Sequence, residues 1–245
     1  MSFWHKVQKL QDMTRPMCTV IVPAAGSSTR MGGENKLFLP LLGVPVLLRT
    51  LRAIDSAELV DEIIVATREE SLLDVADMCA HGGLRKPVRV VVGGASRTES
   101  VLAAAYEMNP KTELVAIHDG ARPLVSHFMI DDMIRLGYKT FAVAPATPVS
   151  DTIKVADESG LVKSTPDHKS LYAVQTPQVF QADILKAALQ SALTSGAEVT
   201  DDCAAVERLG KEVYLTPGDP SNIKITTPTD VAVAEALLRE REVYR

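Results

Sequence analysis

The sequence predicts an α/β fold with a doubly wound, mostly parallel sheet in a three-layer sandwich. Short runs rich in β-branched residues alternate with longer segments whose apolar residues recur at helical spacing, which is typical of parallel sheets. The short runs are apolar at consecutive positions, as strands buried on both faces are. They predict strands at 18–22, 62–66, 88–92, 114–117 and 141–145.

Helices are predicted between these strands, where apolar residues return every three to four positions. The segments with this spacing are 46–55, 69–81, 98–108 and 126–136. Right-handed crossovers between parallel strands then place helices on both faces of the sheet.

The segment 147–178 interrupts this alternation. Its strand-like runs at 152–155 and 161–164 flank the turn residues 157–160, which predicts a projecting hairpin arm. A helix is expected after it, from about 181 to 193.

The last part of the chain returns to alternating helix and strand signals. It predicts a helix at 201–209 capped by Thr200, a strand at 212–216, and a C-terminal helix that starts after Thr227-Pro228.

Length and composition predict one globular domain. The chain has 245 residues, of which 46% are hydrophobic, enough for a substantial core. We expect a single domain over 18–241, with an N-terminal extension at 1–17 and the arm at about 148–172.

Charge and cysteine content bear on partners and location. A net charge of −5 and an aromatic content of 4% argue against nucleic-acid binding. Three widely spaced cysteines fit reduced thiols in a cytoplasmic protein. Residues 1–17 lack the apolar core of a signal peptide, and no apolar run of about 20 residues predicts a membrane span.

The first predicted strand leads into a loop suited to a nucleotide. Ala24, Ala25 and Gly26 are small, so phosphate oxygens can approach the backbone N–H groups. Arg30 and Lys36 add positive charge. The loop matches neither the Walker A motif nor GxGxxG, which disfavours a P-loop ATPase and a dehydrogenase.

Two further loops are expected at the same sheet edge, because ligands of such folds lie beyond the carboxyl ends of the strands. In the loop 93–100, Gly94 permits close backbone approach and Ser100 offers a hydroxyl to a base or ribose. An ordinary strand-to-helix turn capped by Ser96 explains this loop equally well.

The loop 118–123 carries charges that are costly to bury without partners. Asp119 could accept hydrogen bonds from sugar hydroxyls or help hold hydrated Mg²⁺, and Arg122 could pair with a phosphate or hold Asp119 in place. Lys224 interrupts a strand-like apolar run, although a surface lysine would do the same.

Together these motifs resemble the 2-C-methyl-D-erythritol 4-phosphate cytidylyltransferase family, in order from about Thr19 to Leu238. The residues that carry the resemblance are Pro23-Ala24-Ala25-Gly26 with Arg30-Met31 and Lys36, Gly93-Gly94 with Arg97 and Ser100-Val101, His118-Asp119-Gly120-Ala121-Arg122-Pro123, Thr176-Pro177-Gln178, Thr200-Asp201-Asp202 and Asn222-Ile223-Lys224.

The resemblance implies a fold of the nucleotide-diphospho-sugar transferase type and a CTP-dependent reaction. CTP and 2-C-methyl-D-erythritol 4-phosphate would give 4-diphosphocytidyl-2-C-methyl-D-erythritol and pyrophosphate, an early step in making isoprenoid precursors. Mg²⁺ would be held mainly by the CTP phosphates, and we assign no metal-ligating residues.

The same resemblance implies roles for individual residues. Arg30 and Lys36 would stabilise the transition state, and Lys224 would position the acceptor and the α-phosphate. The residues implied to enclose CTP are Ala24, Ala25, Gly26, Gly94, Ala95 and Ser100, and those implied to face the methylerythritol are Asp119, Arg122 and Thr176.

A homodimer is implied as well, in which the arm crosses a two-fold axis and Thr152 completes the partner's acceptor site. Two positions depart from the family pattern. His168 stands where an arginine usually clamps the acceptor phosphate, so either Lys169 takes over or the phosphate is held less tightly. Ala95 stands where an aspartate is often found.

Two other functions share part of this pattern. A ribitol-5-phosphate cytidylyltransferase would use the same loops and chemistry, but the Pro23-Ala24-Ala25-Gly26 start favours the methylerythritol enzyme. A non-catalytic nucleotide-binding module is disfavoured because Arg30, Lys36 and Lys224 are all present.

Overall fold

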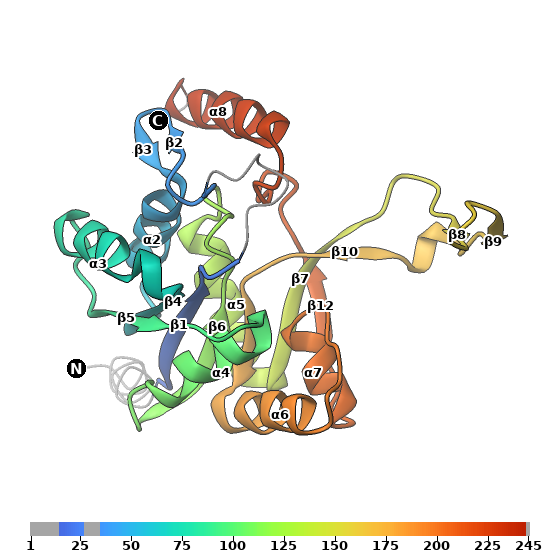
Figure 1. The fold of residues 1–245 in the computed structure, drawn as a ribbon, viewed down its shortest axis with the longest axis horizontal. Helices are drawn as coiled ribbons and strands as arrows, with labels where there is room; N and C mark the ends of the chain where they lie inside the picture. The colour runs from blue at the N-terminus through green and yellow to red at the C-terminus, as the bar shows by residue number, and fades with distance from the viewer. Residues whose placement is uncertain (1–14, 27–34, 244–245) are drawn as a thin grey trace, which may run out of the picture.

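An eight-stranded mixed sheet runs through the centre of the computed structural model, which describes residues 15–26 and 35–243 (Figure 1). The strands follow the order β10-β7-β11-β6-β1-β4-β5, and β12 also pairs with β7. Their bounds are Met17–Pro23 (β1), Glu62–Thr67 (β4), Val88–Val92 (β5), Thr112–Ile117 (β6), Ala142–Pro148 (β7), Tyr172–Val174 (β10), Gln178–Gln181 (β11) and Tyr214–Pro217 (β12).

Helices cover both faces of this sheet, as predicted. One face packs against α2, α3 and α5, and the other against α4, α6 and α7. The helices span Val46–Ser56 (α2), Leu72–His81 (α3), Arg97–Tyr106 (α4), His127–Thr140 (α5), Ala182–Thr194 (α6), Asp202–Arg208 (α7) and Pro228–Val243 (α8).

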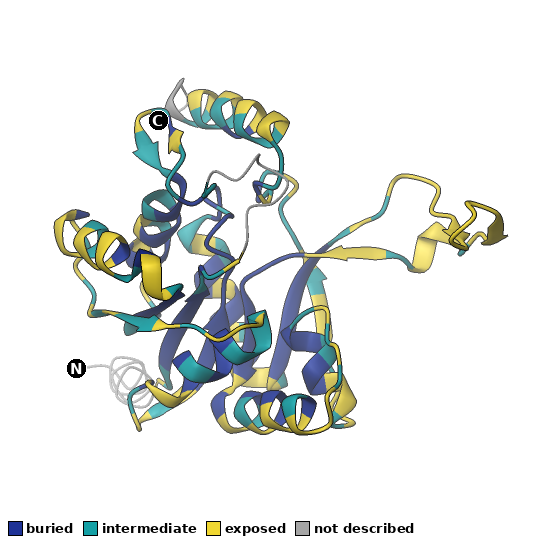
Figure 2. Cartoon of the chain, in the orientation of Figure 1, coloured by how far each residue is buried: buried dark blue, intermediate teal, exposed yellow. Residues whose placement is uncertain are grey.

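The central strands divide their side chains between two cores. In β1, Val20 and Val22 belong to the core beneath α2 and α5, whereas Ile21 belongs to the core beneath α4 and α6. This alternation follows from the two-residue period of a strand, and it explains why the strands are apolar at consecutive positions. Figure 2 shows the sheet as a buried layer between the helices.

The predicted strand 88–92 is present as β5, but the expectation that it is buried on both faces is wrong. It pairs only with β4 at the edge of the sheet, and the side chain of Val92 is exposed. An edge strand has one neighbour instead of two, so less of its surface is covered.

The strands β10 and β11 are absent from the sequence-based expectations. The four-residue strand β11 lies antiparallel between β6 and β7, so the sheet is mixed, although the β1–β4, β1–β6, β4–β5 and β7–β12 pairs are parallel. The cap of α7 also differs: Asp201, rather than Thr200, accepts the N–H of Ala204 at 2.9 Å.

Smaller differences concern element ends. The helix expected at 69–81 begins as a 3₁₀ turn, η2 (Glu69–Ser71), before α3. Phe141, expected to start a strand, instead ends α5 with φ of 67°.

The predicted arm projects from the sheet after β7 and returns through β10 (Figure 1). Near its tip, β8 (Val155–Ala156) and β9 (Val162–Ser164) pair antiparallel, and η3 (His168–Ser170) follows. Almost every arm residue is exposed (Figure 2).

Of the expected N-terminal extension, residues 1–14 lie outside the described residues, so the domain boundaries stay a prediction. Within the described part of the chain, no helix combines the length and apolarity that a bilayer span requires.

Gly137 allows α5 to lie close to the sheet. A Cβ at this position would overlap the side chain of Val179 in β11. We expect Gly137→Ala to lower the free energy of unfolding by roughly 1 to 2 kcal/mol, because overpacking outweighs the better helix propensity of alanine. Urea unfolding measures this, with Lys139→Ala on the exposed side of α5 as the control. Unchanged or increased stability of Gly137→Ala would contradict the close packing.

Candidate active site

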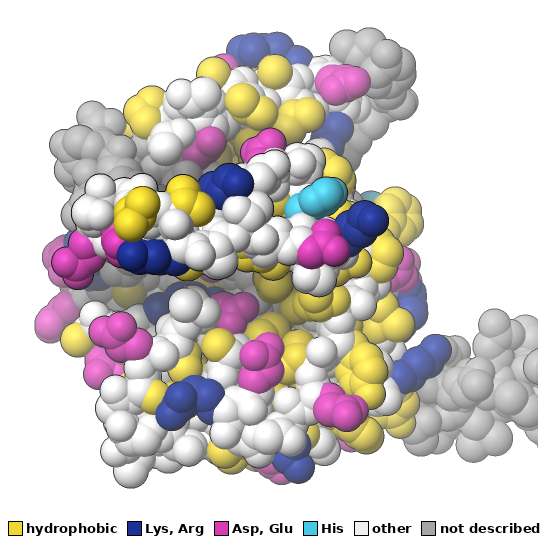
Figure 3. Space-filling view, turned by 90° about the vertical axis from the view of Figure 1, so that its right-hand side faces the viewer, with side chains coloured by type: hydrophobic (Ala, Val, Ile, Leu, Met, Phe, Trp, Pro, Cys, Tyr) yellow, Lys and Arg dark blue, Asp and Glu magenta, His cyan; other side chains and the backbone are white. Residues whose placement is uncertain are grey.

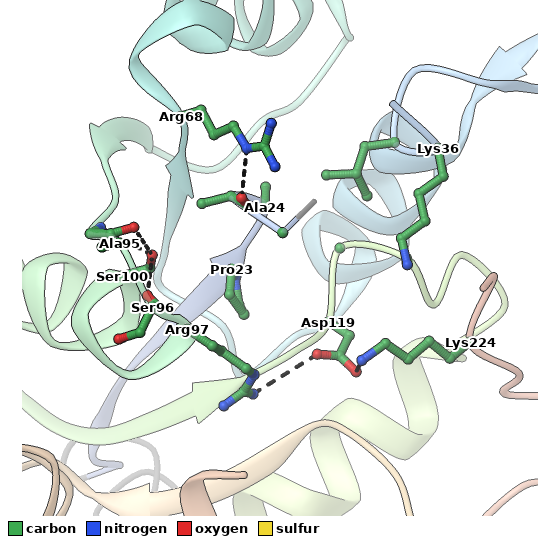
Figure 4. Close-up of a pocket in the computed structure, with 16 residues that line it drawn as sticks. Pro23, Ala24, Lys36, Arg68, Ala95, Ser96, Arg97, Ser100, Asp119 and Lys224 are labelled. Atoms are coloured by element: carbon green, nitrogen blue, oxygen red, sulfur yellow. Dashed lines mark hydrogen bonds and ion pairs between the residues drawn. The ribbon is translucent and has the colours of Figure 1, made fainter. Parts of the chain in front are cut away.

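The carboxyl ends of β1, β4, β5 and β6 meet at one edge of the sheet, where the loops that follow them surround a pocket. Backbone hydrogen bonds continue past the strand ends: Ala24 N–H donates to Ala66 O and Gly93 N–H to Thr67 O, both at 2.7 Å. The pocket has a volume of about 500 Å³ (Figure 4). It is lined by Pro23, Ala24, Ala25, Gly26, Lys36, Leu37, Arg68, Gly94, Ala95, Ser96, Arg97, Ser100, Asp119, Gly120, Ala121 and Lys224.

The convergence of three loops predicted from the sequence is thus present in the structure. The lining includes all six residues expected to enclose CTP, together with Lys36, Asp119 and Lys224. Arg30 lies outside the described residues, so its role stays a prediction.

The loop between β5 and α4 is fixed by its own side chains. Ser96 caps α4 by accepting the N–H of Glu99 at 3.1 Å, and Glu99 in turn accepts the N–H groups of Ala95 and Ser96. The Ser100 hydroxyl donates to Ser96 O at 2.8 Å and accepts the N–H of Gly94. The capped turn and the pocket wall are therefore one structure, and the Ser100 hydroxyl is engaged within the loop.

Asp119 stands at the centre of a charged cluster on the pocket floor. Its carboxylate oxygens lie 2.9 Å from Lys224 Nζ, 3.5 Å from Arg122 Nε and 3.9 Å from Arg97 Nη2. Burial alone would raise the pKa of Asp119, but the charges of Lys224 and Arg97 outweigh burial and lower it to about 2. Asp119 is therefore an ionised hydrogen-bond acceptor at neutral pH.

Arg97 and Asp202 extend this cluster into the core. Arg97 Nη2 lies 2.7 Å from a carboxylate oxygen of Asp202, which is fully buried in the first turn of α7. Burial raises the pKa of Asp202, and Arg97 opposes that rise. Both residues belong to the sequence motifs, but no role is predicted for either, because only the fold brings Asp202 to Arg97.

Arg122 and Thr176 lie beside the pocket floor, and neither lines the pocket. Arg122 donates to Asn222 O at 2.7 Å, and the Thr176 hydroxyl accepts the N–H of Asp119 at 3.1 Å. Of the two roles left open for Arg122, this geometry favours holding Asp119 in place. His118 shares the Thr176 hydroxyl, and burial lowers the pKa of His118 to about 4.

Lys36 and Lys224 enter the pocket from the same side, and the ammonium group of Lys224 reaches Asp119 (Figure 4). The segment that carries Lys224 is held by the hydrogen bond from Ile225 N–H to Ala121 O at 2.8 Å. The side chain of Lys224 is 41% exposed and lines the pocket. The lysine that interrupts the apolar run is therefore a pocket residue.

Arg68 lines the pocket but is not among the site residues predicted from the sequence. It follows the last residue of β4 and donates from Nε to Ala25 O at 2.9 Å. A cation directly after a buried strand, at the edge where the other loops lie, is the signal that could have identified it.

A family model for 2-C-methyl-D-erythritol 4-phosphate cytidylyltransferase matches residues 18–240. The chain belongs to this family. A cytidylyltransferase of that name from Symbiobacterium thermophilum is 45% identical over 223 residues, which cover 91% of this chain and 93% of that protein. Another from Caldanaerobacter subterraneus is 43% identical over 228 residues, covering 91% and 99%. The chain is accordingly a nucleotidyltransferase of isoprenoid precursor synthesis.

Solved structures of the family share its fold. The 4-diphosphocytidyl-2C-methyl-D-erythritol synthase of Anaerococcus prevotii superposes with a TM-score of 0.79 at 32% identity, covering 92% of this chain and all of that one. The cytidylyltransferase of Thermus thermophilus gives 0.72 at 30% identity, covering 90% and 98%. The predicted fold class is confirmed.

The arm residues Thr152 and His168 are exposed and do not line the pocket of their own chain. The expectation that they serve a partner's site stays a prediction.

The Asp202–Arg97 pair joins α7 to the pocket loop, so its loss should destabilise the fold. We expect Asp202→Asn to lower the free energy of unfolding by about 2 to 3 kcal/mol, because Arg97 loses its closest counter-charge inside the protein. Urea unfolding at neutral pH measures this. As a control, Asp132→Asn removes an ion pair of 2.8 Å in which both side chains are more than half exposed, and should cost less than about 1 kcal/mol. Equal losses in the two variants would contradict a stabilising role for the buried pair.

Proposed function

We propose that this pocket carries out the family's reaction, the transfer of CMP from CTP to 2-C-methyl-D-erythritol 4-phosphate. The observation that carries the proposal is that Lys36, Lys224 and the ionised Asp119 line one pocket together with the small residues Ala24, Ala25 and Gly26.

The reaction needs positioned positive charge more than it needs a base. A phosphate oxygen of the acceptor attacks the α-phosphorus of CTP, the bond to the bridging oxygen of the β-phosphate breaks, and pyrophosphate leaves. A phosphomonoester is already ionised at neutral pH, so no group has to remove a proton. Negative charge on the α-phosphoryl group is stabilised by cations already in place.

We assign Lys36 and Arg30 to the α-phosphate and Lys224 to the junction between acceptor and α-phosphate. CTP would lie between Ala24-Ala25 and the Gly94-Ala95 loop. Asp119, ionised because its pKa is about 2, accepts hydrogen bonds from acceptor hydroxyls. Arg122 and Thr176, expected to face the acceptor, would act through Asp119, which both contact.

Mg²⁺ is assigned to the triphosphate. Among the described residues, no group of three or more histidine, cysteine, aspartate or glutamate side chains is placed to hold a metal ion. Asp119 is already paired with Lys224 and Arg97. A Mg²⁺ ion carried by phosphate oxygens requires no such group, and when bound it supplies charge neutralisation.

We propose a homodimer in which each arm completes the partner's acceptor site. The arm exposes several large apolar side chains: Ile153, Val155, Leu161, Val162, Tyr172 and Val174. On the side from which it projects, hydrophobic and charged side chains are interspersed (Figure 3). Thr152 would reach the partner's acceptor, and His168 or Lys169 its phosphate. A cytoplasmic location, which the three free thiols suit, also stays a prediction.

The acceptor is tested by pyrophosphate release from CTP and Mg²⁺ with 2-C-methyl-D-erythritol 4-phosphate, with ribitol 5-phosphate, or with no acceptor. We expect release only with the methylerythritol phosphate.

Lys36→Ala should lower kcat by about 10² or more, because a preorganised transition-state contact is lost, while CTP binding stays measurable.

Calorimetry of CTP binding to both proteins is the control for this test. Release with ribitol phosphate alone would change the acceptor and retain the chemistry. Equal turnover by Lys36→Ala and the parent would remove Lys36 from the mechanism.

The shared site is tested by mixing two variants that are each inactive. Lys36→Ala has an intact arm, and an arm variant that combines Thr152→Ala, His168→Ala and Lys169→Ala has an intact pocket. In a random mixture, half of the dimers are heterodimers and one of their two sites is intact, so about a quarter of parental activity should return. No recovery after confirmed subunit exchange would place the arm outside the partner's site.

A further inference from the structure

Arg68 is the pocket cation that the proposed chemistry leaves without a role. It lies at the carboxyl end of β4, whose neighbours in the sheet are β1 and β5. The loops that follow those neighbours carry Ala24-Ala25 on one side and Gly94-Ala95 on the other. Arg68 therefore lies at the nucleotide end of the pocket, away from β6 and the Asp119 cluster (Figure 4).

Two guanidinium nitrogens of Arg68 have partners among the described residues. Nε donates to Ala25 O at 2.9 Å, and Nη1 lies 3.3 Å from a carboxylate oxygen of Glu70. The side chain of Glu70 is 69% exposed, so this contact is well solvated and contributes little. Figure 4 shows the terminal nitrogens of Arg68 on the side of its side chain that faces Lys36 across the pocket.

Other cations of the pocket have closer counter-charges. Arg97 lies 2.7 Å from the buried Asp202, and Lys224 lies 2.9 Å from Asp119. Separating either pair would uncover a buried carboxylate, whereas Arg68 can exchange Glu70 for another anion at small cost. A guanidinium is also the side chain best matched to two oxygens of one phosphate.

We propose that Arg68 is a further nucleotide-binding residue that contacts the triphosphate of CTP and exchanges Glu70 for phosphate oxygens. This inference rests on the proposed function. Because Nε is anchored to Ala25, the residue before Gly26, the Nη1–Nη2 end of the guanidinium lies beside the start of the loop assigned to the phosphates and becomes available when Glu70 is exchanged. Glu70 then acts as a competing anion that holds Arg68 in the empty pocket.

The test compares dissociation constants of CTP and CMP in the presence of Mg²⁺, measured by calorimetry. Arg68→Met should weaken CTP about tenfold and CMP less than about twofold, because only CTP carries the β- and γ-phosphates. Glu70→Gln should tighten CTP about twofold by removing the competing anion. In the double variant the effect of Glu70→Gln should vanish, since the carboxylate then has no guanidinium to compete for.

Arg135→Met is the matched control, because Arg135 is an exposed arginine paired with Asp132 on α5 and does not line the pocket. It should leave CTP affinity unchanged, and thermal unfolding verifies that each variant is folded. Arg68→Lys, which retains the charge and loses the fork, should fall between the parent and Arg68→Met.

Equal weakening of CTP and CMP by Arg68→Met would place Arg68 against the nucleoside and overturn the proposal, as would unchanged CTP affinity. Turnover by the parent with CTP and methylerythritol phosphate, measured alongside, keeps the two ideas separate. If the parent turns over and Arg68→Met binds CTP normally, only the role of Arg68 fails. If the parent neither binds nor uses CTP, the proposed function fails and this inference fails with it.

Discussion

The ionised carboxylate of Asp119 is the interaction on which the rest of the pocket depends. Its oxygens face Lys224, Arg97 and Arg122, which come from three different parts of the chain. Arg97 also forms an ion pair with Asp202 in α7. A buried charge is tolerated only when it is paired. The positions of four segments therefore depend on one another: the loop after β6, the start of α4, the segment before α8 and the start of α7.

The sheet supplies the frame for this cluster. Strands that run parallel end at the same edge, and backbone hydrogen bonds to Ala66 and Thr67 of β4 hold Ala24 and Gly93, each one residue past the end of its own strand. Neighbouring strands lie about 4.8 Å apart, so loops that leave consecutive strands are within side-chain reach of one another. The pocket is thus set by backbone geometry first, and its side chains are then fixed by local caps such as the Ser96–Glu99 pair.

Sequence patterns identify the elements that show a clear spacing of apolar residues. The central strands have apolar residues at consecutive positions, and the amphipathic helices have them every three to four positions. The pattern fails for β11, because its four residues, which begin and end with glutamine, carry no period long enough to be distinguished from a loop, and their burial comes from pairing with β6 and β7. The exposure of β5 has the same origin, since its place at the sheet edge is decided by the strand order. The functional loops are predicted by small residues and charge, whereas the Arg97–Asp202 contact exists only after α7 has packed.

The charges of the pocket are divided according to what each half must do. Near Asp119, three cations face two carboxylates at distances between 2.7 and 3.9 Å, so this end of the pocket, to which we assign the acceptor, has fixed geometry and little excess charge. Such an arrangement suits a polyol phosphate, because its hydroxyls need an oriented acceptor and its phosphate can share Lys224 without exposing Asp119. In the proposed arrangement the nucleotide end receives a highly charged triphosphate, and there the carboxylate that Arg68 meets among the described residues is the solvated one of Glu70, at 3.3 Å. Cations held in place before the substrate arrives cost no reorganisation in the transition state. The proposal therefore places the closely paired groups beside the reacting phosphorus and the exchangeable Arg68 beside the leaving pyrophosphate.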